Sequence, residues 1–261
     1  MICAGIDAGS RAIKIVLLDA ESLATVASGM AAQGVRSGEL ALQLFHELLN
    51  RSGRSLRDVG RVIATGYARN AVSVADSTIT EITCHAAGVR HLVPEARTII
   101  EIGGQDSKLL RLSPEGNVYD FAMNDRCAAG TGRFLEVVAD RLGVELEALG
   151  EMAARSRKPA AISSTCIVFA ETEIIGLLAG GAAPEDIAAG VQNSIVTRIS
   201  SMIGRSITPP VIFTGGVALV SGMGRALERV LGQPVRVAPE PHMTGALGAA
   251  LLASRQSQIK T

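Results

Sequence analysis

The chain has 261 residues, 25 basic and 25 acidic side chains and a sequence pI near 6.9, which argues against a surface for nucleic acid or anionic membranes. Aromatic residues make up only 3%, so base-stacking platforms are not expected, and the 48% of apolar residues fall in runs too short to span a bilayer. Because the chain also opens without a basic leader and cleavage site, we expect a cytoplasmic protein with an aliphatic core and no membrane partner.

Apolar alternation and turn residues predict the elements of the first half. We expect strands at 2–7, 12–19, 23–28 and 61–65, and helices at 37–52 and 80–91. Tight turns join the three opening strands. Pro94 breaks the chain after the second helix and marks the best domain boundary.

The strand pattern restarts at Thr98. We expect strands at 98–102, 107–112, 117–123, 211–214 and 235–237, and helices at 131–142, 145–154, 184–203, 221–231 and 244–254. Isoleucine and valine at four-residue spacing along the 184–203 helix indicate a core face. Residues 162–169 stay unassigned because their apolar residues lie only at the two ends. We therefore predict one domain at 1–95, joined by a terminal helix at 244–256, and a second at 96–243.

Three glycine turns follow predicted strands. They are Asp7-Ala8-Gly9-Ser10, Gly103-Gly104-Gln105-Asp106 and Thr214-Gly215-Gly216. Glycine lets backbone N–H groups approach phosphate oxygens, and neighbouring acids can hold Mg²⁺ or its waters. One such turn is weak evidence, because turns between strands commonly contain glycine. The three in this order favour a nucleotide site, with Lys14 as an added charge, although no P-loop motif occurs.

The cysteines are Cys3, Cys84, Cys127 and Cys166, and no Cys-x-x-Cys occurs. Cys127 lies in the stretch Asn124–Val138, in a polar and glycine-rich lead-in before a predicted helix, where unpaired N–H groups favour a bound anion. The local sequence alone fits a structural thiol better than a metal ligand. We expect Cys3 to be a core residue and His85, next to Cys84, to be a structural helical histidine.

The three glycine turns resemble the two phosphate loops and the adenosine loop of the acetate and sugar kinase, Hsp70 and actin superfamily. That resemblance implies an α/β fold of two ribonuclease-H-like, actin-like ATPase domains with the nucleotide cleft between them. A narrower resemblance, over nearly the whole chain, is to the ATP-dependent activators (component A) of (R)-2-hydroxyacyl-CoA dehydratases. It rests on Thr65–Tyr67 with Arg69, Thr83–Ala86, Ile102–Asp106, Asn124–Phe134, Ser163–Cys166, Phe169–Glu171 and Gly245–Ala250.

This resemblance implies a homodimer that shares one oxygen-sensitive [4Fe–4S] cluster, with Cys127 and Cys166 of each chain as ligands. Two cysteines per chain complete four ligands only in a dimer. The implied function couples ATP hydrolysis to low-potential one-electron reduction of a cluster-containing acceptor enzyme, with ferredoxin or flavodoxin as donor. Such proteins belong to anaerobic metabolism.

The resemblance also implies roles for the turn residues. Phosphates are expected at Gly9, Ser10, Arg11, Ala12, Ile13, Lys14, Gly103 and Gly104. Asp7 and Asp106 would serve Mg²⁺ and its waters, Gln105 would orient the attacking water, and Gly215 and Gly216 would border the nucleoside. Two residues depart from the family pattern: Arg11 replaces a hydroxyl residue, and Ile167 replaces a threonine after the second cysteine.

Three alternatives remain open. An ATPase subunit of a benzoyl-CoA reductase, or a reductase of a double-cubane cluster protein, would share these motifs. A small-molecule kinase of the same superfamily would give the two cysteines no role. A nucleotide-regulated binding protein of the actin or chaperone type would hydrolyse ATP without redox chemistry.

Overall fold

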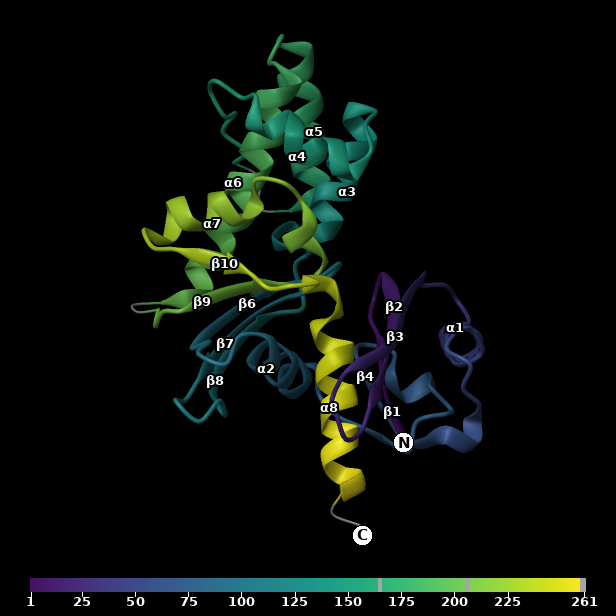
Figure 1. Cartoon of the computed structure of the whole chain (residues 1–261). Helices are drawn as coiled ribbons and strands as arrows, with labels where there is room; N and C mark the ends of the chain where they lie inside the picture. The colour runs from purple at the N-terminus through teal and green to yellow at the C-terminus, as the bar shows by residue number, and fades with distance from the viewer. Residues whose placement is uncertain (164–165, 205–206, 259–261) are drawn as a thin grey trace. The chain divides into compact units, whose positions relative to one another are not determined.

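A computed structural model describes residues 1–163, 166–204 and 207–258, and the chain divides into two compact units. Unit 1 consists of Met1–Glu95, Ser113–Val118 and Met243–Thr261, and unit 2 of Ala96–Leu112 and Tyr119–His242. Each unit is built on a five-stranded sheet with helices packed against it (Figure 1).

The sheet of unit 1 has the strand order β3-β2-β1-β4-β5. Its elements are β1 (Ile2–Ala8), β2 (Ala12–Asp19), β3 (Thr25–Ala32), α1 (Ser37–Arg51), β4 (Val59–Thr65), β5 (Ser77–Thr78), α2 (Glu81–Leu92) and α8 (Thr244–Gln258). Strand β1 pairs antiparallel with β2 and parallel with β4. All of β1 is buried, because α1 covers one face of the sheet and α8 the other.

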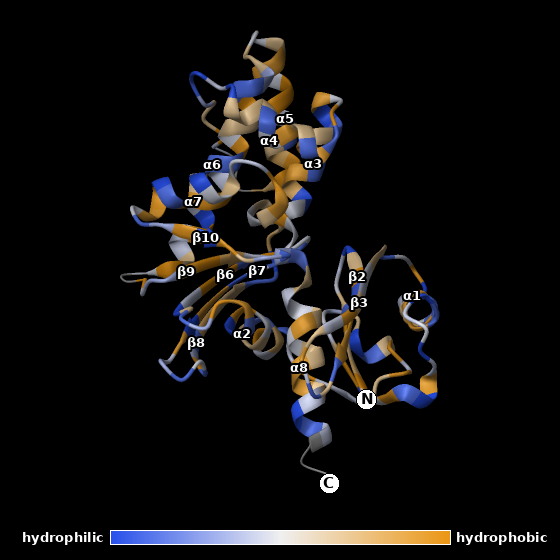
Figure 2. Ribbon diagram, in the orientation of Figure 1, coloured by the Kyte–Doolittle hydropathy of each residue, from blue (hydrophilic) through white to orange (hydrophobic). Residues whose placement is uncertain are grey.

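Helices α2 and α8 approach closely through glycines. A Cβ atom on Gly248 would lie 1.8 Å from the carbonyl oxygen of Cys84, and one on Gly88 would lie 2.1 Å from that of Thr244. Helix α8 is apolar along most of its length and polar toward its C-terminal end (Figure 2), as expected for a helix whose first turns are buried.

The sheet of unit 2 has the order β10-β9-β6-β7-β8. Its strands are β6 (Thr98–Ile102), β7 (Ser107–Leu112), β8 (Val118–Asn124), β9 (Val211–Thr214) and β10 (Val235–Val237). Its helices are α3 (Gly132–Leu142), α4 (Leu146–Ala154), α5 (Ile167–Ala179), α6 (Pro184–Ile203) and α7 (Met223–Leu231). One face of the sheet and the helices share a single aliphatic core, in which the isoleucine and valine face of α6 is buried as its spacing predicts.

Three elements differ clearly from the prediction. Strand β5 was not expected, because two residues are too few to show an alternating pattern. Helix α5 begins inside the segment left unassigned. It was not predicted, because Ile167–Ala179 is apolar nearly all round and shows no helical periodicity. Strand β3 begins at Thr25 rather than Leu23, since Leu23 has φ 57° in the turn that precedes the strand. Among the described residues, no helix combines the length and apolarity required for a membrane span.

Candidate functional site

The first glycine turn is held by Gln33, in unit 1. The backbone N–H of Gly9 donates to the carbonyl of Ala12 at 3.1 Å, and Gln33 Nε2 donates to the carbonyl of Gly9 at 2.7 Å. Arg11 is exposed, whereas the side chain of Ile13 is buried in the sheet. Only the backbone of Ile13 could therefore contact a ligand at this turn. The turn is therefore preformed, and Ser10 lies partly exposed at its tip.

Asp7 lies at the base of this turn and is almost fully buried. Lys14, its partner across the β1–β2 hairpin, places Nζ 3.1 Å from Asp7 Oδ2. A Cβ atom on Gly66 would come within 2.5 Å of Asp7 Oδ1, and one on Gly245 within 3.1 Å of Oδ2. The carboxylate is thus enclosed by one ammonium group and two glycine backbones.

The second turn, in unit 2, has the same backbone bond. The N–H of Gly103 donates to the carbonyl of Asp106 at 2.9 Å. Gln105 is exposed and Asp106 is partly exposed, so both side chains are accessible from solvent. Lys108 Nζ lies 2.7 Å from Asp106 Oδ2, which holds the carboxylate at one side of the turn.

The third turn packs against the second. Gly215 has φ 89°, and its N–H donates to the carbonyl of Pro241 at 3.0 Å. A Cβ atom on Gly215 would lie 2.3 Å from the carbonyl oxygen of Ile102. Gly216 is exposed and opens a short 3-10 turn, Gly216–Leu219, instead of leading directly into α7. Unit 2 therefore brings two of the three predicted glycine turns together.

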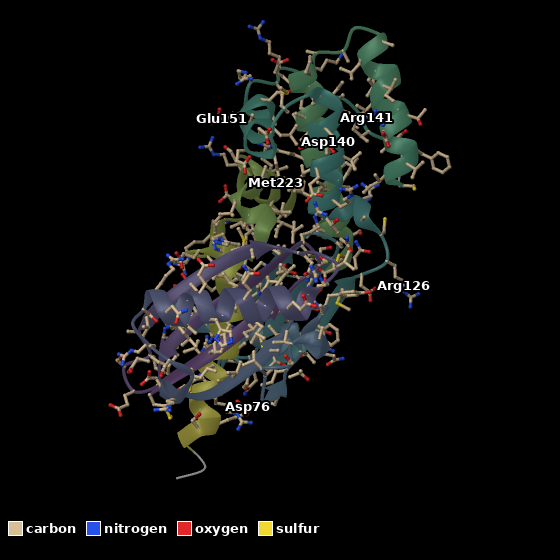
Figure 3. All side chains as sticks on the ribbon, turned by 90° about the vertical axis from the view of Figure 1, so that its right-hand side faces the viewer. Asp76, Arg126, Asp140, Arg141, Glu151 and Met223 are labelled. Carbon is tan, nitrogen blue, oxygen red and sulfur yellow. The ribbon has the colours of Figure 1, made fainter. Side chains whose placement is uncertain are left out.

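Cys127 lies in an exposed loop fixed by Asn124. The Asn124 side chain accepts from the N–H of Cys127 at 3.1 Å and donates to its carbonyl at 2.7 Å. A 3-10 turn, Ala128–Gly130, follows, so the cysteine is separated from α3 by one short turn. The neighbouring Arg126 projects away from the ribbon (Figure 3) with a side chain 95% exposed.

The N-terminus of α3 is bonded directly to the second glycine turn. The N–H groups of Gly132 and Arg133 donate to the carbonyls of Gly103 and Gly104, both at 2.9 Å. The buried hydroxyl of Thr131 lies 3.1 Å from the carbonyl oxygen of Gly104 and 2.7 Å from that of Ala128. Within unit 2, the glycine turn and the Cys127 loop are therefore connected by a few hydrogen bonds.

Cys166 is exposed at the N-cap position of α5. Exposed Phe169 follows in the first turn of this helix. Arg141 of α3 forms an ion pair with Glu171 of α5, which ties the helix after one exposed cysteine to the helix after the other. Two residues of the predicted 163–166 motif, Ser164 and Thr165, lie outside the described residues.

The other two cysteines are buried. Burial raises the pKa of the Cys84 thiol to about 12. His85 Nδ1 lies 3.0 Å from the hydroxyl of Thr244, so the expectation of a structural histidine is confirmed. Neither Cys3 nor Cys84 is accessible for ligating a metal at the surface.

The donor chemistry fits half of an iron–sulfur ligand set. Cys127 and Cys166 offer two exposed thiols in one unit, and an iron–sulfur cluster takes four cysteines. Across residues 1–163, 166–204 and 207–258, no three His, Cys, Asp or Glu side chains are grouped to hold a metal ion. A four-cysteine cluster held by these two thiols would therefore need two further ligands from a partner.

Sequence reasoning missed several residues of these turns. They are Gln33, Glu101 and Lys108. Asn124 and Thr131 lie in a stretch that the sequence analysis singles out, but their contacts were not foreseen. The spacing of Glu101 from Gly103, the same as that of Asp7 from Gly9, was a signal that could have found Glu101. The others act through contacts that spacing along the chain does not reveal.

The comparisons with known proteins show which family the chain belongs to. The model of the BadF/BadG/BcrA/BcrD ATPase family matches residues 4–253. The chain belongs to this family. It is 41% identical to the (R)-2-hydroxyglutaryl-CoA dehydratase activating ATPase of Acidaminococcus fermentans, over 97% of each chain. It is also 31% identical to one of the subunits of benzoyl-CoA reductase from Thauera aromatica, over 96% of this chain and 92% of the relative.

A solved member of the BadF/BadG/BcrA/BcrD family has the same fold. The activator of the 2-hydroxyisocaproyl-CoA dehydratase from Clostridium difficile, with bound ADPNP, superposes with a TM-score of 0.93 at 42% identity. The match covers 100% of this chain and 97% of that one. The predicted α/β, two-domain ATPase fold of the actin-like type is therefore confirmed.

Proposed function

We propose that this chain is an ATP-dependent electron-transfer protein of the cytoplasm that activates a 2-hydroxyacyl-CoA dehydratase. It would act as a homodimer and use ATP hydrolysis to deliver single electrons at low potential. The observation that carries this proposal is the direct bonding of α3 to the Gly103–Gly104 turn, a few residues from Cys127. The names of two relatives as dehydratase activators support the choice of partner.

ATP is assigned to the glycine turns. Backbone bonds donated by Gly9 and Gly103 preform both turns, so other N–H groups of the Gly9–Lys14 and Gly103–Gly104 segments would contact phosphate oxygens. Asp7 and Asp106 would hold Mg²⁺ or its waters, and the exposed Gln105 would orient the attacking water. Gly215 and Gly216 would border the nucleoside.

Cys127 and Cys166 of two protein copies would hold one shared [4Fe–4S] cluster. When bound, this group supplies a one-electron redox centre whose potential depends on its charge, its hydrogen bonds and its exposure to solvent. Asn124 fixes the Cys127 backbone, and the start of α5 fixes that of Cys166. The exposed Phe169 would shield this region from water in the dimer.

Thr131, Gly132 and Arg133 would transmit the state of the nucleotide. Any shift of the Gly103 and Gly104 carbonyls on ATP binding must break these bonds or move the start of α3. The Arg141–Glu171 ion pair would carry the same motion to α5. Both cysteine-bearing segments would then respond to ATP.

Two other functions compete with this one. An ATPase component of a benzoyl-CoA reductase would use the same chemistry with another acceptor, in line with the 31% identity to a protein of that enzyme. A small-molecule kinase of the same fold leaves Cys127 and Cys166 without a task. The pairing of two exposed thiols with an ion pair between their helices favours the redox function.

The experiment is an anaerobic activation assay. The purified protein is mixed with reduced ferredoxin or flavodoxin, MgATP and a purified 2-hydroxyacyl-CoA dehydratase, and dehydration of the acyl-CoA is followed. We expect activation that requires hydrolysable ATP and is lost in Cys127→Ser, while ATP hydrolysis persists in that variant. Activation that survives in Cys127→Ser would refute the proposal.

A further inference from the structure

Lys108 is a buried amine held between two carboxylates in unit 2. Its side chain is 1% exposed, and Nζ lies 3.0 Å from Glu101 Oε2 and 2.7 Å from Asp106 Oδ2. Burying an ammonium group costs free energy unless the charge is paired, so the two acids allow Lys108 to be buried. Since Lys108 does not reach the surface, it can act on a ligand only through these acids.

The other oxygen of Glu101 faces the glycine turns. A Cβ atom on Gly103 would lie 3.1 Å from Glu101 Oε1, and one on Gly215 would lie 2.7 Å from the same atom. Lys108 therefore holds one oxygen of the carboxylate, while the second lies under both turns. The orientation of Glu101 depends on the contact with Lys108.

The same arrangement of an acid and a lysine across a hairpin occurs in unit 1. Glu101 faces Lys108 across the β6–β7 hairpin in the register in which Asp7 faces Lys14 across β1–β2. The ammonium-to-carboxylate distances are 3.0 and 3.1 Å. In both hairpins the glycine turn begins two residues after the acid. The structural counterpart of Asp7 is therefore Glu101, whereas Asp106 is an additional acid.

We propose that Lys108 is a positioning residue for ATP hydrolysis, which fixes Glu101 and Asp106 at the nucleotide site. The inference rests on the proposed assignment of the Gly103 and Gly215 turns to ATP. Two acids with fixed orientation hold Mg²⁺-bound water and the attacking water in line, and such positioning is the main source of rate in phosphoryl transfer. Lys108 touches neither water nor nucleotide itself.

The test compares Lys108→Met, Glu101→Gln and the double variant. ATP turnover is measured without any acceptor enzyme, and ADP affinity by calorimetry. We expect kcat to fall roughly 100-fold in each single variant with ADP affinity within about threefold, because positioning groups act in the transition state. The double variant should be less than about tenfold slower than Glu101→Gln, because only the contact of Lys108 with Asp106 remains to be lost and residues that act as a unit are not additive.

Arg111→Met is the matched control. Arg111 lies on the same strand as Lys108 and pairs with Asp120 at 2.5 Å, away from the glycine turns. This variant should melt earlier yet keep the wild-type kcat. Near-normal turnover in a cooperatively folded Lys108→Met, or effects that multiply in the double variant, would overturn the proposal.

Misfolding of one variant does not leave the proposal untested. If Lys108→Met fails to fold, the double variant still replaces the Lys108–Glu101 ion pair by neutral groups, and a kcat about 100-fold below that of Glu101→Gln, as two independent effects would give, would overturn the inference. The readout is also separate from electron transfer. Failure to activate a dehydratase would count against the proposed function and leave the Lys108 result standing.

Discussion

The cysteines of this chain occupy two environments, and their reactivity should divide accordingly. Cys127 and Cys166 are exposed, whereas Cys3 and Cys84 are buried and the pKa of Cys84 is raised to about 12. The thiolate is the nucleophile, so Cys84 stays unreactive at pH 8. In metal-free native protein, we expect Ellman's reagent to titrate about two thiols rapidly. Cys127→Ser/Cys166→Ser should abolish this phase, and a rapid phase that persists would contradict the assignment.

Close contact between α2 and α8 makes Gly248 sensitive to the smallest substitution. A Cβ atom there would lie 1.8 Å from the carbonyl oxygen of Cys84, so the helices must separate. We expect Gly248→Ala to lower the free energy of unfolding by roughly 2–4 kcal/mol in urea titration. Gly176→Ala in α5, where nothing lies within 4 Å, should be neutral or raise it by about 0.5–1 kcal/mol.

Single residues were predictable from sequence where a motif is contiguous. The three glycine turns and the Cys127 lead-in each occupy a few adjacent positions, so composition and spacing were enough to mark them. Glu101 and Lys108 were overlooked because their pairing depends on cross-strand register. Gln33 holds the Gly9 turn from just beyond the end of β3, a contact that sequence spacing does not reveal.

At the scale of elements, the start of α3 joins the Gly103–Gly104 turn to the loop of Cys127. Thr131→Val removes the hydroxyl that bridges Gly104 and Ala128 but keeps its shape. We expect ATP hydrolysis to stay within about threefold, because the variant leaves the glycine turns intact. The ATP-dependent change in the rate of iron removal by a chelator should be lost.

Thr131→Ser is the control for this coupling. It retains the hydroxyl and should preserve most of the ATP effect on chelation. If Thr131→Val responds to ATP like the wild type, the hydroxyl carries no coupling. Loss in Thr131→Ser as well would indicate that the coupling needs both the hydroxyl and the packing of the threonine methyl group.

The start of α6 is fastened by Asp186, which should make stability depend on acid pH. Ser156 and the N–H groups of Arg157 and Lys158 donate to its carboxylate, and these bonds lower its pKa below 3.8. A carboxyl group whose pKa is lower in the folded state than in the unfolded state stabilises the fold at any pH above its unfolded pKa. This stabilisation is lost as the pH falls through the folded pKa. Asp186→Asn should therefore destabilise at pH 7, and the difference from wild type should shrink below pH 3.8.

Thermal melting across this pH range measures the effect. A difference that is the same at pH 7 and in strong acid would contradict the role of the charge.

Elements with a clear period or caps, such as α6 with Pro184 at its start, were placed correctly from sequence. Helix α5 was missed because its apolar residues surround the helix and hide the period.

For the whole molecule, the fold was predicted from the resemblance of the three glycine turns to those of a known superfamily. The state of assembly was predicted only through the narrower family resemblance, and it stays a prediction. Each chain exposes the thiols of Cys127 and Cys166. If these are ligands of a cluster that takes four cysteines, two copies of this chain are needed around one iron–sulfur centre.

The most direct test is iron and sulfide analysis combined with mass measurement on protein purified without air. We predict a dimer with about four irons, which loses its iron in Cys127→Ser and in Cys166→Ser. A monomer that contains no iron and still hydrolyses ATP at its full rate would contradict the account.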